Sequence, residues 1–399
     1  DPMKFDDNGW DDFELDDLQS MDSSSEEEEL EAPESPLDTL ATAWLTGHDT
    51  DVAAALAASL PVAEVLQQLM QVSEGLGVEP NLLLAFSDLS PADTELVRRE
   101  WALIPESRRY AIITYLVALA EEELDLFLGP ILRVALQDPS PTVRALALDG
   151  LWEDNGSDLI GPLVQMLLND KDNGVRAAAA QALGAFVLAG ELDELDTALS
   201  MRAEEALLSV LLNPEQPVAV RRRALESIAY SGETGVRQLI EDAYYDPEEE
   251  MRISSLIAMG RSADIRWRGL VRAELRNPST AMRGEAAIAC GELEATAARG
   301  ELIALLEDEE QLVRLAAITA LGQIGGKAAQ EALRGMSASE DPVEVEAADL
   351  ALEELLFMQD DQDIALYDED ELLEDWDDEP WDQPYDADDD DDLGDYADE

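Results

Sequence analysis

Residues 308–326 read DEEQLVRLAAITALGQIGG, in which an acidic turn leads into a Val-Arg pair, a run of small and apolar residues, and two glycines. Residues 246–260, DPEEEMRISSLIAMG, follow the same pattern with Met in place of Val. Recurrence of one short unit is the signature of a repeat architecture. The length of 399 residues therefore does not by itself predict several separate compact domains.

The Arg of this pair sets the period of the repeat. Successive copies are separated by 32, 45, 31, 31 and 31 residues, so the unit is about 31 residues long. The interval of 45 holds one unit plus an insertion around 187–200, which we expect to form a lengthened loop. The column consists of Arg144, Arg176, Arg221, Arg252, Arg283 and Arg314.

Other columns keep a constant character relative to this Arg. The position before it is always Val or Met, the residues three and six positions after it are small, and the seventh holds Leu, Ile, Met or Cys290. These offsets fall on one face of a helix with 3.6 residues per turn. Each Arg is therefore predicted to lie on an amphipathic helix whose small residues allow another helix to approach closely.

A turn precedes each of these helices. Six residues before the Arg stand Asp138, Asp170, Glu215, Asp246, Asn277 and Asp308, three of them followed by Pro. Asp or Asn before Pro is typical of a helix N-cap with Pro in the first turn. A second apolar periodic stretch lies upstream of each turn, for example GPILRVAL from 129 to 136. The unit is therefore predicted to be an antiparallel helix pair.

These columns resemble HEAT repeats, in particular the short bacterial form of the phycobilisome-lyase type. The resemblance implies an all-α HEAT-like α-solenoid, a right-handed stack of about seven helix pairs over residues 124–357. It also implies that each column Arg pairs with the acidic residue of the preceding turn and has a structural role.

The ends of the array depart from the pattern. In 341–357, Glu346 stands in the Arg column and Asp349 in a small-residue column, which is typical of a polar capping repeat. Upstream, 105–123 keeps Arg108 as the Arg of a degenerate unit. We therefore expect a degenerate N-terminal helical cap at 37–123, between the repeats and an acidic tail at 1–36, with a second tail at 358–399.

The net charge of −67 is concentrated at the two ends. Residues 1–40 contribute −15 and residues 360–399 contribute −22. Direct nucleic-acid binding is disfavoured, because such binding depends on Lys and Arg that displace counterions from phosphates. A halophilic source is an open alternative explanation, although it should spread the acidity over the whole surface.

Both tails mix aromatic residues with Asp and Glu. Such segments cannot pack a core, so we expect them to be disordered. Solubilisation alone does not require aromatics, which are typical anchors of interfaces. The candidate docking anchors are Trp10, Phe13, Trp376, Trp381 and Tyr385.

One part of the array is locally basic. Residues 261–283 hold six Arg against Asp264 and Glu274. Arg268, Arg272 and Arg276 are spaced for one exposed helical stripe, which is either an ordinary solvated face or a docking site for an anion. Our hypothesis is that the C-terminal tail covers this stripe until a partner displaces it.

Residues suited to catalysis are scarce. Cys290 is the only cysteine and His48 the only histidine, so no disulfide, Cys/His zinc site or Cys-His pair can form within the chain. Cys290 is expected to be a buried apolar residue and His48 a turn residue. A single histidine also argues against the di-iron hydroxylases of the HEAT family, and the net charge against its DNA glycosylases. No metal, cofactor or catalytic residue is predicted.

The sequence thus indicates a protein that binds other proteins. No membrane-spanning run and no signal peptide is evident, so we expect a cytoplasmic protein. We predict a non-catalytic scaffold or adaptor whose protein partner is basic, with no direct nucleic-acid or membrane contact. Two alternatives stay open: an acidic chaperone or nucleic-acid mimic that sequesters a basic protein, and a bilin-lyase-like enzyme or its accessory subunit.

Overall fold

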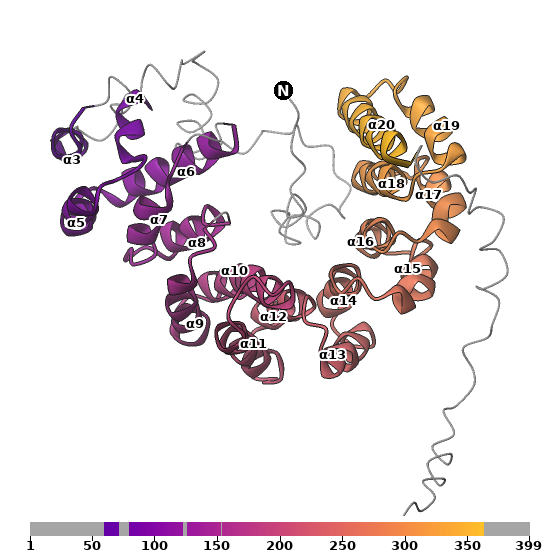
Figure 1. The fold of residues 1–399 in the computed structure, drawn as a ribbon, viewed down its shortest axis with the longest axis horizontal. Helices are drawn as coiled ribbons and strands as arrows, with labels where there is room; N and C mark the ends of the chain where they lie inside the picture. Colours follow the sequence, from indigo (N-terminus) through magenta and orange to yellow (C-terminus); the bar gives the residue numbers. More distant parts are fainter. Residues whose placement is uncertain (1–59, 72–79, 123–125, 153, 363–399) are drawn as a thin grey trace, which may run out of the picture.

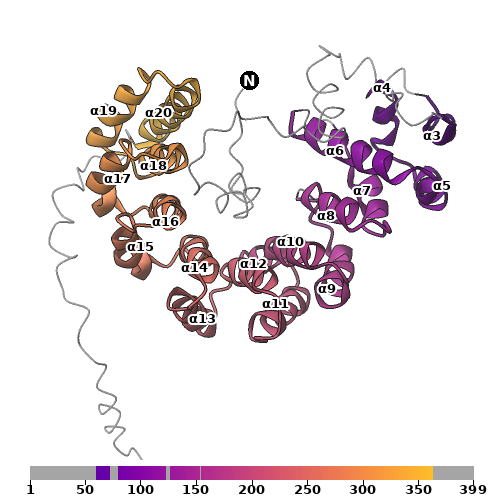
Figure 2. The ribbon, with the colours of Figure 1, turned by 180° about the vertical axis from the view of Figure 1, so that it is seen from behind.

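The computed structural model describes residues 60–71, 80–122, 126–152 and 154–362. These residues form helices joined by turns, with no strand among them. Antiparallel helix pairs stack side by side into an open arch (Figure 1), which Figure 2 shows from behind. The predicted all-α solenoid is confirmed.

The arch has two layers of helices, and the Arg columns lie on the inner one. The inner helices line the concave side (Figures 1 and 2) and are α6 (Glu106–Glu122), α8 (Pro141–Asp149), α10 (Asn173–Glu191), α12 (Val218–Ile228), α14 (Glu249–Arg261), α16 (Thr280–Glu292), α18 (Gln311–Ile324) and α20 (Pro342–Gln362). The outer helices are α7 (Gly129–Ala135), α9 (Ile160–Asn169), α11 (Thr197–Leu211), α13 (Thr234–Tyr244), α15 (Arg268–Glu274), α17 (Arg299–Leu305) and α19 (Lys327–Met336).

Short elements complete the stack at its N-terminal end and at several turns. The N-terminal part packs against the first pairs and consists of α3 (Val62–Gln71), α4 (Pro80–Leu83), η2 (Leu84–Phe86), α5 (Pro91–Glu100) and η3 (Trp101–Leu103). Single 3₁₀ turns open three of the outer helices, namely η4 (Ser157–Leu159), η5 (Ile265–Trp267) and η6 (Thr296–Ala298).

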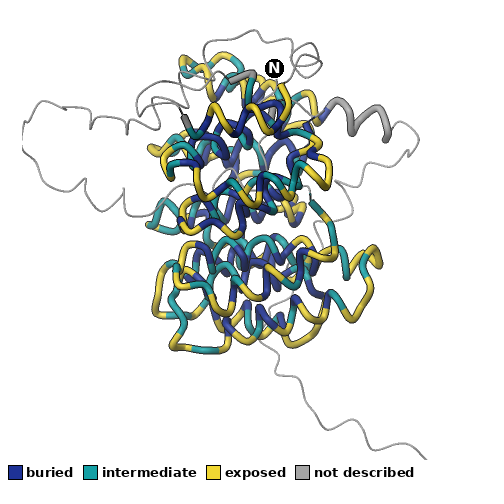
Figure 3. The backbone as a smooth tube through the Cα atoms, turned by 90° about the vertical axis from the view of Figure 1, so that its left-hand side faces the viewer, coloured by how far each residue is buried: buried dark blue, intermediate teal, exposed yellow. Residues whose placement is uncertain are grey.

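The apolar columns form the core between the two layers. The residues before the column Arg are all buried, as are the small residues three positions after it and the larger ones seven positions after it. Figure 3 shows buried positions along the inside of the stack and exposed ones at its turns. One helix pair could not bury these faces alone, so each repeat depends on its neighbours.

Successive inner helices approach one another closely at a glycine column that the sequence analysis did not use. It lies eight residues after the Arg, at Gly184, Gly260, Gly291 and Gly322. A methyl group on Gly291 would lie 2.9 Å from the Cα of Ala320, and one on Gly322 would lie 3.2 Å from the Cα of Ala351. Backbone therefore packs against backbone, with small residues on the facing helix.

The turn column has a different local role from the predicted one. The side chain of Asp308 accepts the backbone N–H of Glu310, two residues on, and the helix N-caps are Glu310 and its counterparts rather than the column residues. The Pro that follows three of these residues therefore lies outside the helix, where it favours extended backbone in the residue before it. In the third unit Asn213, not Glu215, takes this position and accepts the N–H of Glu215.

The insertion around 187–200 does not form a lengthened loop. Instead α10 continues to Glu191 and α11 already begins at Thr197. The reason is that Phe186 and Val187 are buried, so the extra turns of α10 are held by core packing. At the C-terminal end, α20 continues to Gln362, beyond the predicted end of the array at 357.

Two glycines of α16 offer a matched test of the close approach between inner helices. Gly291→Ala should lower the free energy of unfolding by about 1–3 kcal/mol, because its methyl group meets the backbone of α18. Gly284→Ala has no atom within 4 Å of the added methyl group and should instead raise it by about 0.5–1 kcal/mol. Urea denaturation would measure both. Equal effects of the two substitutions would contradict close packing at Gly291.

Candidate interaction surfaces

The column Arg side chains tie each repeat to the next along one edge of the arch. Arg283 donates through Nη1 to the carbonyls of Asn277 and Pro278 in its own preceding turn, at 3.0 and 3.1 Å. Its Nε and Nη2 donate to both carboxylate oxygens of Asp308, each at 2.9 Å. Asp308 belongs to the turn of the following repeat, so the expected pairing with the acid of the preceding turn is wrong. The guanidinium spans both turns.

The same bridge recurs near both ends of the array. Arg144 reaches Asp170 at 2.7 and 3.0 Å, and Arg314 reaches Glu344 at 2.6 Å. Each of these arginines also donates to the carbonyls of its own turn. The bonds are charge-assisted and partly buried, which makes them stronger than exposed ion pairs.

We call this series of bridges the arginine ladder. Its first member is Arg109 rather than the predicted Arg108. Arg109 donates to both carboxylate oxygens of Asp138 at 2.7 and 3.0 Å, and both side chains are buried. Arg108 instead reaches the carbonyl of Leu69 at 2.6 Å. The degenerate N-terminal unit therefore joins the array through the same bridge as the regular repeats.

The middle of the ladder is weaker. Arg176 donates to the neutral side chain of Gln216, and Arg221 lies 3.9 Å from Asp246. Arg252 donates to two carbonyls of its own turn but makes no ion pair within the described part of the chain. The next turn offers it Asn277 in place of an aspartate, so it lacks the bidentate bridge to the following repeat.

A second set of arginines, missed by the sequence analysis, ties the opposite edge. Each reaches from an outer helix to the turn that ends the inner helix of its own repeat. Arg268 donates to the carbonyl of Leu293 at 2.7 Å, and Arg299 to that of Gly325 at 2.9 Å. Arg133 binds Asp154 and Asp158, and Arg237 binds Asp264. The spacing of 31 residues between Arg237, Arg268 and Arg299 was the available sequence signal.

The three arginines of the predicted stripe all have partners within the described residues. Arg268 is engaged as described, and Arg272 and Arg276 both reach Glu301 of the next repeat, at 3.1 and 3.3 Å. Their side chains remain 42% and 78% exposed. Glu301 offsets part of the positive charge that the local sequence suggested, so the three arginines do not form one freely exposed stripe.

The residues on the concave side of the inner helices change in character along the described part of the array. Positions one and five residues after the Arg, and two before it, lie opposite the buried columns of the inner helices. In α8, α10 and α12 the residues one and five positions after the Arg are alanine or polar. From α14 to α18 most of this set is apolar, although Glu250 and Thr319 are polar. Six of its members form what we call the inner strip: Ile253, Ile257, Gly284, Ile288, Leu312 and Leu315.

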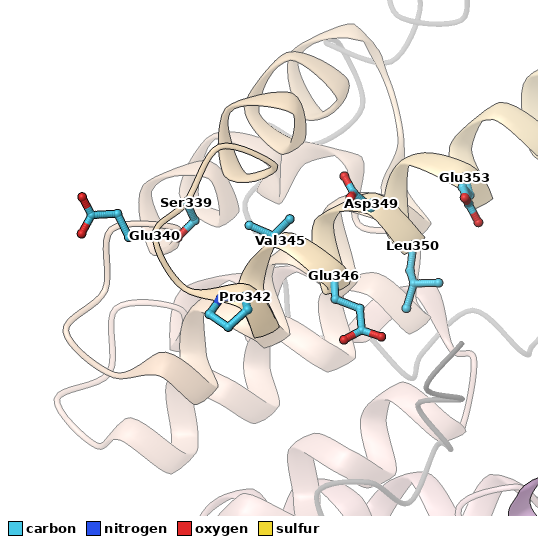
Figure 4. Close-up of a pocket in the computed structure, with 8 residues that line it drawn as sticks. All are labelled: Ser339, Glu340, Pro342, Val345, Glu346, Asp349, Leu350 and Glu353. Atoms are coloured by element: carbon cyan, nitrogen blue, oxygen red, sulfur yellow. The ribbon is translucent and has the colours of Figure 1, made fainter. Parts of the chain in front are cut away.

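The exposed end of the stack has a different composition. An open pocket lies on α20 and the turn before it (Figure 4), lined by Ser339, Glu340, Pro342, Val345, Glu346, Asp349, Leu350 and Glu353. Glu346 and Asp349 are exposed. Carboxylates thus stand where another repeat would otherwise stack. The predicted register of this repeat is wrong by one residue: Ala348 and Ala351 are the buried small residues, so Val345 and not Glu346 takes the Arg column, and Asp349 is in no small-residue column.

The remaining predicted site residues divide between the core and the undescribed segments. Cys290 is fully buried, and burial raises the pKa of its thiol to about 12, which suits a core residue rather than a nucleophile. His48, Trp10, Phe13, Trp376, Trp381 and Tyr385 lie outside the described residues, as do most of both tails.

No cluster of three or more His, Cys, Asp or Glu side chains suited to a metal ion occurs among residues 60–71, 80–122, 126–152 and 154–362. Within the same ranges, no helix is long and apolar enough to span a membrane.

Comparison with known proteins identifies the repeat. Residues 129–205 and 270–353 match the family model for HEAT repeats. The search of curated proteins gave no match. Similar solved structures include YibA of Escherichia coli, 19% identical over 63% of this chain and 98% of that one, with a TM-score of 0.36.

Two other similar structures belong to proteins that differ in activity, a lyase and a hydroxylase. The complex of CpcE and CpcF of phycocyanin lyase from Nostoc sp. PCC7120 is 18% identical over 57% of this chain and 94% of that one, with a TM-score of 0.39. Human deoxyhypusine hydroxylase is 18% identical over 76% of this chain and 98% of that one, with a TM-score of 0.31.

Arg283 provides a test of the structural role predicted for the ladder. Arg283→Ala should lower the free energy of unfolding by about 1–3 kcal/mol, because it strands a partly buried Asp308 and two carbonyls. Arg252→Ala, in the same column but without a carboxylate partner, should cost about 1 kcal/mol or less. Thermal unfolding measures both. A binding defect in Arg283→Ala at unchanged stability would make the column functional instead.

The ion pairs of the ladder should also make the stability of the protein depend on pH in the acid range. Burial raises the pKa of Asp308, but the bonds from Arg283 and the N–H of Glu310 outweigh it, so the pKa lies below its ordinary value; the pKa of Asp170 is lowered similarly beside Arg144. Stability from a lowered carboxyl pKa is present above the unfolded value, about 3.9, and is lost as the pH falls through the folded value.

We therefore expect the free energy of unfolding to drop as the pH falls below about 4, with a shallower drop in Arg283→Ala. Urea denaturation at stepped pH would measure it. Identical pH slopes in the two proteins would show that the Asp308 pair does not contribute.

The helix pairs, the recurring spacing of their columns and the two matched stretches together show that residues 129–205 and 270–353 of this chain are HEAT repeats.

Proposed function

We propose that this chain is a non-catalytic scaffold that binds a basic protein partner on the concave side of the arch, in the cytoplasm. The observation that carries the proposal is that arginines and carboxylates differ in how many internal bonds they make among the described residues. Arginines are largely engaged in bonds within and between repeats, whereas many carboxylates are left to face solvent.

Both arginine sets illustrate this use of positive charge. The ladder and the opposite edge place guanidinium groups on carbonyls and carboxylates of the turns, where they stabilise the stack. Their charge is therefore offset or directed inward, and the protein surface keeps the excess of acid. An acidic surface attracts basic partners and raises their rate of association.

The free carboxylates lie close to the concave side. Glu248, Glu249, Glu250, Glu309 and Glu310 lie at the N-terminal ends of α14 and α18, and none of them makes an ion pair within the described part of the chain. These side chains are exposed or half-buried. They can thus pair with Lys or Arg of a partner without first breaking an internal bond.

The same charge pattern favours one of the alternatives, an acidic chaperone that sequesters basic proteins. The two functions differ in their need for the arch. A scaffold binds through the shape and chemistry of one surface, whereas a chaperone acting by charge alone binds over the whole acidic surface and at both tails.

Crosslinking can separate these functions. The full chain would be immobilised, incubated with lysate of the source organism and treated with a carbodiimide, which activates a carboxylate and couples it to a lysine amine of the partner, leaving the urea. We expect basic proteins to be retained and their crosslinks to map to the inner helices and the adjoining turns. A chain carrying Arg276→Ala, on the outer side, should give the same map.

Three outcomes would overturn the proposal. Crosslinks spread evenly over the outer helices and tails would favour the chaperone. Capture of a pigment-bearing subunit together with bilin transfer would favour the lyase. Retention of no protein above the level of an unrelated acidic protein would leave no binding function to assign.

A further inference from the structure

We infer that the inner strip across α14, α16 and α18 is the docking site of an amphipathic, basic segment of the partner, with its apolar side chains on the strip. This inference rests on the proposed function and makes it specific. It names the part of the concave surface that is used and the chemistry of the segment that fits.

The strip joins core residues to apolar residues that reach the surface. Positions one and five residues after the Arg face away from the outer helices, and other repeats carry polar residues there, such as Gln181 and Thr319. Ile257 and Ile288 are nevertheless isoleucines and both are half-buried, and Leu312, two residues before its Arg, is 36% exposed. Ile253 and Leu315 are each 7% exposed and continue the strip into the core.

Gly284 provides space in the middle of the strip. It stands in the same column as Ile253 and Leu315, on the helix between theirs. Gly284 is buried, yet apart from the adjoining backbone of its own helix no heavy atom lies within 4 Å of the position its Cβ would occupy. Ile253 and Leu315 thus lie on either side of an open position at Gly284. One apolar side chain of a partner can enter there.

Charge selects a basic occupant. The carboxylates of Glu248, Glu249 and Glu250 lie at the start of α14, and those of Glu309 and Glu310 lie at the start of α18. They border the strip at the end where both helices begin. A segment with Lys or Arg beside its apolar anchors can satisfy both surfaces, whereas an acidic segment, such as either tail of this chain, would be repelled at this border.

The size of the strip fits a short helix. Adjacent packed helices lie about 8–10 Å apart, so two steps from α14 to α18 cover roughly 20 Å. A helix rises about 1.5 Å per residue, so about 14 residues reach across. Apolar residues at helical spacing would then face all three inner helices at once.

A defined peptide tests the inference. The probe is a 14-residue amphipathic peptide of Leu and Lys with its leucines on one helical face, and calorimetry with the full chain measures the affinity. We expect binding that weakens with added salt. A second peptide in which Ser replaces every Leu keeps the charge and should bind at least about tenfold more weakly, since it has no apolar anchor.

Two glycines give matched variants of the chain. Gly284→Leu should fill the open position and lower the affinity for the Leu-Lys peptide by about tenfold or more. Gly300→Leu, on outer helix α17, also has no atom within 4 Å of its Cβ position and should leave the affinity unchanged. Circular dichroism and thermal unfolding confirm that both variants fold, and Leu312→Ser provides a second change in the strip should Gly284→Leu be unstable.

The possible results separate this inference from the proposed function. If the Ser peptide binds as tightly as the Leu peptide, or if Gly284→Leu and Leu312→Ser both bind normally, the strip is not the docking site. Partner crosslinks to other inner helices would then still support the scaffold. Loss of partner capture from the lysate in Gly284→Leu but not in Gly300→Leu would support both proposals.

Discussion

The close approach of successive inner helices is the constraint on which this arch depends. At Gly291 and Gly322 the backbone of one helix packs against the Cα of the next, so no side chain can stand between them. The facing residues, Ala320 and Ala351, must be small for the same reason. Because the inner layer packs this closely, stacking places the inner helices on the concave side and the outer helices on the convex side.

The arginines at both edges hold this stacking in register. Helix packing alone permits sliding, since ridges and grooves recur along each helix. A guanidinium that binds its own turn and the turn of the next repeat, as Arg283 does with Asn277 and Asp308, fixes the relative height of the two repeats. This arrangement uses much of the positive charge internally, which explains how a stable core can carry so acidic a surface.

The sequence was sufficient to predict the elements that follow from periodicity. The helix pairs and their buried columns repeat every 31 residues, and local pattern determines them. The partners of the arginines were harder to predict, because an Arg can reach both the turn six residues before it and the turn of the next repeat, and the sequence does not show which acid it binds. Arg108 and Arg109 could not be told apart, and Asn213 was missed, because one-residue or two-residue shifts in a turn do not alter the helical pattern.

The candidate site was the least predictable part, for a physical reason. Fold selection acts on the columns that must be apolar or small, whereas Ile257 and Ile288 lie outside those columns. Their neighbours in other repeats include Gln181 and Thr319, which shows that the fold accepts polar residues there. Ile288 packs against the core, whereas Ile257 and the partly exposed Leu312 leave apolar surface on the concave side. Together with the free space above Gly284, this surface is the part of the proposed docking site that the repeat pattern alone could not reveal.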